Sequence, residues 1–222
     1  MHDHNDSFPL GGKLFIIACL LMLLTALAAE ILLRWSSVTL VIDGVAWYLL
    51  WSMVTLGAVA FAAGIVTLCR PFDSHIAGYT RTIAGMSAFF ALLHLSIMVV
   101  PQFFQRRARA RVWVATTETE TPTVVTVLEA LGHSWLIVQM LFLGIAVVIL
   151  GILLVRRKAL SKRTGQIGSV LGMFVLYSVV IVALFDGYYL LAYLLTGALY
   201  LWGGYVGVYL LTARESRRLR RV

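Results

Sequence analysis

Six apolar segments, each long enough to cross a bilayer, dominate this sequence and constrain what it can fold into. The hydrocarbon core of a bilayer is about 30 Å thick and an α-helix rises about 1.5 Å per residue, so a spanning helix takes roughly 20 residues. Because lipid offers no hydrogen bonds to an open backbone, and because a barrel would show strands of ~10 alternating residues, these segments predict helices. We expect an all-α integral membrane protein, with residues 1–222 forming a single domain of six transmembrane helices. The expected spans are Leu14–Leu33, Val45–Cys69, Thr82–Pro101, Ser134–Val155, Ile167–Phe185 and Tyr188–Ala213.

The composition agrees with a membrane protein and excludes several other classes. Hydrophobic residues make up 61% of the chain and charged residues 13%, whereas an ordinary soluble domain is about half apolar and about a quarter charged. A soluble globular domain, a disordered chain and a disulfide scaffold are therefore excluded. Lys and Arg number 18 against 10 Asp and Glu, which in a soluble protein would suggest nucleic acid. Here the basic residues flank apolar runs, so we expect the lipid bilayer, and no nucleic acid, as their partner.

The basic residues also predict an orientation. With six crossings, the side that holds both termini receives most of them, chiefly in the clusters at 156–163 and 214–221. The positive-inside rule then places the N-terminus and the C-terminus in the cytoplasm, and we expect a prokaryotic cytoplasmic membrane. Most tryptophans fall near the opposite, outer side, where indole rings favour the membrane interface: Trp35, Trp47, Trp51, Trp113 and Trp135.

One long outer loop, residues 102–132, is expected between the third and fourth spans. It carries four basic residues that the positive-inside rule disfavours on that side, namely Arg106, Arg107, Arg109 and Arg111. Without any function, these side chains could extend to the outer headgroups or pair with acidic residues of the loop. The functional alternative is that they bind an anion, a lipid or a partner. In the second half of the loop, a helix beginning at Pro122 with Thr121 as its cap is preferred over a small β-hairpin.

Titratable residues inside a bilayer cost several kcal/mol unless they are partnered, so each one is a candidate functional residue. His94 is the deepest imidazole, seven residues before Pro101 and so roughly 10 Å below the outer end of its span. His133 begins the fourth span on the same side. Carboxylates at a similar expected depth are Glu30, Glu129 and Asp186.

Several chemistries fit two imidazoles with nearby carboxylates. The group could ligate a metal ion, hold a haem through His94 and His133, or place a quinone. The structural alternative for His94 is a hydrogen bond to a backbone carbonyl or a hydroxyl group. Glu30 can likewise pair with Arg34, one turn later, without any function.

The sixth span is rich in tyrosine. Tyr189 and Tyr193 stand four residues apart and share a helix face with Tyr200, so their phenols could line a polar groove. Small residues at a spacing of four also predict close helix packing, within the bundle in preference to a homo-oligomer. The pairs are Gly168 with Gly172 and Gly203 with Gly207.

No catalytic motif occurs in the chain: GxSxG, HExxH, CxxC, GxGxxG and the phosphate-binding loop are all absent. We therefore expect a polytopic membrane protein without intrinsic catalysis, either a small carrier or channel or a membrane subunit of a larger complex. In a carrier, His94 would be the proton or cation switch, because imidazole titrates near neutral pH. The alternatives are a redox subunit that binds haem, metal or quinone through His94 and His133, and a lipid-handling protein that uses the arginines between Arg106 and Arg111.

Overall fold

The computed structural model describes the main chain of residues 7–35, 42–72, 74–112, 123–156, 158–184 and 189–219. The description leaves out the side chains at 7, 32–35, 42–48, 97–112, 123–130, 132–133, 183–184, 189–190 and 214–219. Every element in the described part is a helix, and the helices are α1 (Ser7–Trp35), α2 (Ile42–Cys69), α3 (His75–Val112), α4 (Thr123–Arg156), α5 (Lys162–Leu184) and α6 (Tyr189–Leu219).

All six helices are long and apolar enough to cross a membrane. Each contains an apolar span of between 21 and 24 residues, which matches the length that the hydrocarbon core requires. The prediction of an all-α, multi-pass integral membrane protein is confirmed at this level.

Helix ends differ from the expected spans where a charged residue interrupts an apolar run. α1 begins at Ser7, ahead of Lys13, and α3 begins at His75, ahead of Arg81. A long charged side chain ends the apolar run but leaves the helical hydrogen bonds intact, because its stem can lie along apolar surface while its head reaches water. The helices therefore extend beyond the segments that hydropathy marks.

The prediction of a loop over residues 102–132 is wrong in its extent. α3 continues through Pro101 to Val112, and α4 begins at Thr123, so most of the expected loop is helical. The β-branched residues of 123–127 lie in α4, which agrees with the helix alternative and not with the hairpin. These residues run directly into a long apolar helix, and that continuity outweighs their weak preference for strands.

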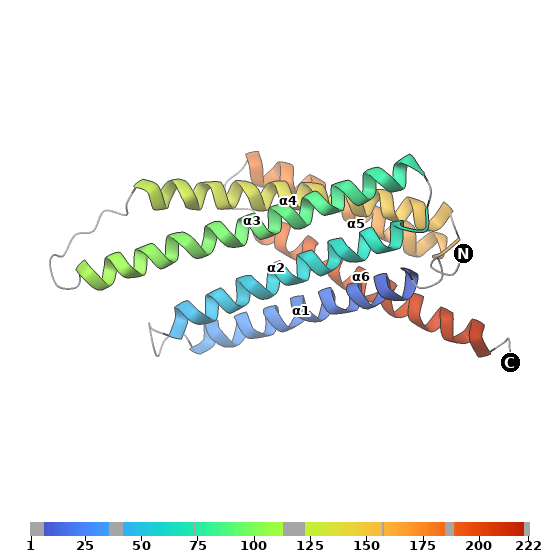
Figure 1. Ribbon diagram of the computed structural model, residues 1–222, viewed down its shortest axis with the longest axis horizontal. Helices are drawn as coiled ribbons and strands as arrows, with labels where there is room; N and C mark the ends of the chain where they lie inside the picture. The colour runs from blue at the N-terminus through green and yellow to red at the C-terminus, as the bar shows by residue number, and fades with distance from the viewer. Residues whose placement is uncertain are drawn as a thin grey trace.

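The six helices close into a ring in chain order (Figure 1). Each helix packs against its neighbours in the sequence, and α6 returns to pack against α1. α1 begins and α6 ends at the same end of the bundle, which we call the terminal end. The opposite end is where α3 leads into α4.

Pairs of glycines bring α4 and α5 into backbone contact. A Cβ atom added at Gly172 would lie 2.8 Å from the carbonyl oxygen of Gly144, and one added at Gly151 would lie 2.7 Å from that of Gly165. Both distances are below van der Waals contact, so only glycine fits at this crossing. Small residues permit such an approach in lipid, where packing and not the hydrophobic effect drives helix association.

α1 crosses both of its neighbours in the same way. A Cβ at Gly11 would lie 3.2 Å from the carbonyl oxygen of Gly64 in α2, and one at Gly12 would lie 3.0 Å from that of Gly207 in α6. The preference for glycine packing within the bundle is therefore confirmed for Gly207, as it is for Gly172. α1, α2 and α6 form one closely packed group.

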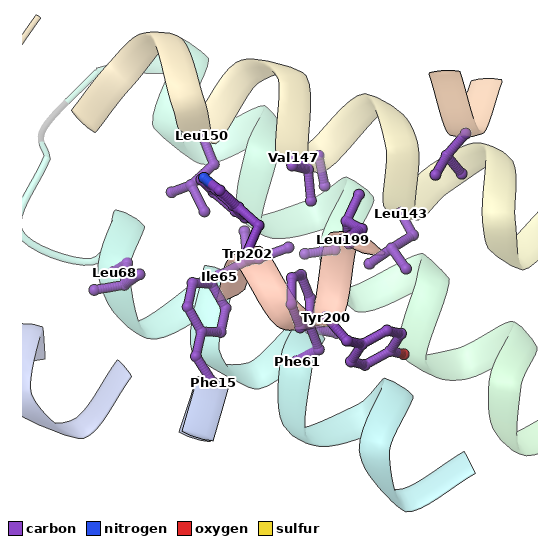
Figure 2. Close-up of a cluster of buried hydrophobic side chains, with 14 of the residues drawn as sticks. Phe15, Phe61, Ile65, Leu68, Leu143, Val147, Leu150, Leu199, Tyr200 and Trp202 are labelled. Carbon is purple, nitrogen blue, oxygen red and sulfur yellow. The ribbon is translucent and has the colours of Figure 1, made fainter. Parts of the chain in front are cut away.

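Aromatic rings fill the interior between these helices (Figure 2). Phe15 of α1 stacks on Phe61 of α2 with ring centroids 4.6 Å apart, and Tyr200 of α6 meets Phe61 edge-on at 4.8 Å. Trp202 lies 6.4 Å from Phe15, also measured between centroids. Gly203 leaves room for the Phe61 ring, which a side chain at that position would displace. We call these four rings the aromatic layer.

Candidate functional site

His94 lies in the interior of the bundle at the contact between α2 and α3. Only 2% of its surface is exposed, although a histidine side chain is polar and is usually at least partly exposed to solvent. Its imidazole meets the indole of Trp51 edge-on, with ring centroids 5.1 Å apart. The sequence therefore locates a buried titratable group correctly, two residues before the end of the apolar span His75–Ser96.

Other polar side chains continue from His94 toward the terminal end. Thr55 is buried one turn from Trp51 and its hydroxyl donates to the Trp51 carbonyl oxygen at 2.9 Å. Ser87, two turns from His94, donates to the carbonyl oxygen of Gln139 in α4 at 3.2 Å, and Gln139 is itself buried. We call Thr55, Ser87, His94 and Gln139 the polar strip.

The polar strip is unusual because buried polar groups are expensive in a bilayer, and membrane proteins keep few of them. Its members come from α2, α3 and α4, three helices that contact one another. The Thr55 hydroxyl is satisfied within its own helix, whereas the Ser87 bond links α3 to α4. The strip thus places buried polar side chains of three helices on the terminal side of His94.

The register of α3 and α4 brings the two candidate histidines to one level. The two helices are antiparallel, and the bond between Ser87 and the Gln139 carbonyl marks where they meet. His94 lies seven residues after Ser87 in α3, and His133 lies six residues before Gln139 in α4. At a rise of about 1.5 Å per residue these two steps are equal to within about 2 Å along the bundle. The His133 side chain itself lies outside the described residues.

Two further predicted residues lie at the surface. Glu30 is exposed on α1, near the opposite end from the termini. Tyr193 is 40% exposed whereas Tyr200 is 2% exposed, so these two phenols do not face a common groove. Tyr200 belongs to the aromatic layer instead, where its ring contacts Phe61.

The remaining predicted residues lie in parts of the chain whose side chains or placement are not described. Asp186 lies between α5 and α6, outside the described main chain. Only the main chain is described for Tyr189, the first residue of α6, for Glu129, in α4, and for the arginine group of α3, which comprises Arg106, Arg107, Arg109 and Arg111. Their predicted roles are not tested.

Comparison with protein-family models, with curated proteins and with solved structures gives no match for this chain. Among the described residues, no three His, Cys, Asp or Glu side chains come together in a manner suited to a metal ion.

Sequence reasoning missed the residue that contacts His94 and two other members of the polar strip. Trp51 is expected at the membrane interface, but its ring packs on the imidazole. Ser87 and Gln139 stand in apolar runs and carry no motif, so their contact follows only from the helix register. The available signal is that each is a hydrogen-bonding side chain inside a predicted span.

Proposed function

We propose that this multi-pass membrane protein is a small carrier in which His94 is the proton or cation switch. The observation that carries the proposal is the burial of His94 against Trp51, at a contact between two groups of helices. Imidazole is the side chain that most often carries a proton switch in proteins. A proton on His94 would place a charge in the interior and change the cost of keeping its surroundings dry.

The division into two groups follows from how the helices touch. The first group is α1, α2 and α6, in which α1 packs against the other two helices through glycines. The second group is α3, α4 and α5, in which α4 packs against α5 through glycines and is joined to α3 by the Ser87 hydrogen bond. Between the groups, the contacts seen among the described residues include two that side chains make. The ring of Trp51 in α2 contacts the imidazole of His94 in α3. The indole of Trp202 in α6 donates a hydrogen bond to the carbonyl oxygen of Thr164 in α5. We call the α2–α3 contact the His94 seam.

A carrier needs one set of contacts that separates and another that holds. Backbone-to-backbone crossings cannot open without losing all of their close packing, whereas side chains at the His94 seam can change rotamer. The proposal is that protonated His94 draws water into the seam and that the two groups then move relative to each other. Such rigid-body rocking is a common mode of alternating access.

Cysteine accessibility tests this movement before any substrate is known. In a background with Cys19→Ala and Cys69→Ala, Ser87→Cys would be exposed to a water-soluble maleimide in proteoliposomes at about pH 5 and about pH 8. A maleimide reacts with the thiolate, so its intrinsic rate falls as the pH falls, and each rate is therefore divided by that of an exposed reference, Lys158→Cys. We expect the corrected rate at Ser87→Cys to be higher at the lower pH, and this difference to be lost when His94→Gln is added. Ala18→Cys, fully buried in the α1–α2 crossing, is the matched control and stays unlabelled.

Labelling that is absent at both pH values, or that keeps its pH difference in the His94→Gln variant, would contradict the switch. A static, structural subunit of a larger complex would then be the better interpretation, and co-purification of partner proteins would test it. With a positive result, a panel of amino acids, sugars, organic acids and divalent cations would be screened for uptake coupled to proton movement.

A redox subunit is the second candidate, and the shared level of His94 and His133 favours it. Two histidines at one depth on neighbouring antiparallel helices suit a haem held by two imidazoles, or a quinone bound between them. An absorption spectrum and metal analysis of the purified protein test this candidate. A Soret band or stoichiometric metal that disappears in His94→Gln supports it, and a colourless, metal-free protein leaves only the quinone version.

A further inference from the structure

A groove lies between α4 and α5 at the terminal end, away from the polar strip. Its volume is about 570 Å³. Apolar walls are supplied by Ile152, Val155 and Val170, and the floor lies at the close crossing of Gly151 with Gly165. At the floor the two backbones are in contact, so no side chain stands between the helices there.

The mouth of the groove is basic. Arg156 is the last residue of one apolar span and Lys162 is the first residue of the next, so both stand where the hydrocarbon core gives way to headgroups. Both are exposed and line the groove together with Gln166. The connection that they flank, residues 156–166, contains no acidic residue.

We propose that this groove binds one anionic phospholipid, with its phosphate at Arg156 and Lys162 and an acyl chain along Ile152 and Val170. Charge complementarity selects the headgroup, because two cations face the mouth and no carboxylate of that connection balances them. The apolar walls select a chain over a soluble anion. Ile152 is 44% exposed and Val170 is 49% exposed, so the groove opens sideways toward the lipid.

Gln166 and Ser169 add polarity between the mouth and the apolar walls. The Ser169 hydroxyl donates to the carbonyl oxygens of Val148 and Gly165, each at 3.2 Å, so it is already engaged within the helix pair. Gln166 is exposed at the groove and its amide can donate to ester or glycerol oxygens. From the mouth to the walls, the groove presents cationic side chains, then the Gln166 amide, then aliphatic side chains. A phospholipid has the matching sequence of groups, from its phosphate through its ester oxygens to its acyl chain.

Native mass spectrometry of the purified protein tests the proposal, with phosphatidylglycerol and phosphatidylcholine of identical acyl chains as probes. We expect phosphatidylglycerol to bind more tightly. The double variant Arg156→Gln with Lys162→Gln is expected to bind it about thirtyfold more weakly, since each basic residue near an anionic lipid is worth about fivefold. Lys13→Gln with Arg70→Gln removes two exposed charges elsewhere in the protein and is the matched control, expected to bind as the parent does.

A second variant separates the apolar part from the charges. Val170→Trp fills the groove without altering charge and is expected to abolish phosphatidylglycerol binding while leaving the thermal unfolding temperature near that of the parent. Equal weakening by both double variants, or equal binding of both lipids, would overturn the proposal. Displacement of the lipid by millimolar inorganic phosphate would also overturn it and identify a soluble anion as the ligand.

Discussion

The backbone crossing of α4 and α5 gives the sharpest prediction about stability. In Gly172→Ala, the new methyl group would lie 2.8 Å from the Gly144 carbonyl oxygen and 3.1 Å from the Val148 amide nitrogen. Both atoms belong to the backbone of a helix, so neither can move alone. The methyl group is accommodated only if the helix axes separate by several tenths of an ångström along the crossing.

The size of the effect follows from that separation. Inserting one methyl group into a well-packed interior costs about 1–3 kcal/mol, and here the neighbouring crossing of Gly151 with Gly165 is strained by the same displacement. For a chain of this size, a loss of 1 kcal/mol lowers the unfolding temperature by about 2–4 °C. We therefore expect Gly172→Ala to unfold about 2–12 °C below the parent protein.

Tryptophan fluorescence during heating in one fixed detergent measures the shift. Gly85→Ala and Gly197→Ala are matched controls, because a Cβ at either glycine would meet no atom within 4 Å. In these two variants the better helix propensity of alanine leaves stability unchanged or raises it by up to about 1 kcal/mol. The reasoning would be refuted if Gly172→Ala unfolded at the same temperature as the two controls.

Three further substitutions test the interior in the same assay. Phe61→Ala empties the centre of the aromatic layer and is expected to cost about 3–5 kcal/mol, whereas Leu56→Ala, at an exposed position of the same helix, should cost little; equal losses would contradict the assigned burial. Trp202→Phe keeps the ring packing but removes the indole donor to the Thr164 carbonyl oxygen at 3.0 Å, a loss of about 1 kcal/mol, and an unchanged unfolding temperature would show that this bond contributes nothing. Ser87→Ala removes the bond between α3 and α4 and should cost about 0.6 kcal/mol, typical of hydrogen bonds between membrane helices, so a loss of several kcal/mol would indicate a larger role in packing.

The fold class could be predicted because lipid leaves few choices. A run such as Ser134–Val155 has the length of the bilayer core and no way to satisfy its backbone except as a helix, and the observed span Ser134–Arg156 differs by one residue. Boundaries were harder where charges enter a helix. Arg81 and Lys13 end hydropathic runs but lie inside α3 and α1, because helix hydrogen bonds do not depend on side-chain polarity.

The burial of His94 could be predicted from the sequence, but the helix that it faces could not. His94 stands out because a histidine inside a span is rare. Its expected depth of roughly 10 Å depends on a span that ends at Pro101, whereas the apolar span of the described residues ends at Ser96, two residues after His94. Which helix it faces depends on the rotation of α3, and this depends on packing across the whole ring. Trp51 and Gln139 therefore could not be assigned to the site until the helix register was known.

The same packing explains why opening would occur between the two helix groups, at the His94 seam and at the contact of α5 with α6. Glycines place α1 against α2 and α6, and α4 against α5, so closely that separation loses many contacts at once, and the Ser87 bond joins α3 to α4. Between α5 and α6 the described contacts include one hydrogen bond, from Trp202 to Thr164, and the insertion of the Trp202 ring at Gly168. Phe61 of the aromatic layer lies closer to the terminal end of α2 than Thr55 does, so a solute that entered from the opposite end would reach the polar strip first. A carrier built this way would release its solute only after Trp202 leaves Thr164, which connects the stability of that bond to the rate of transport.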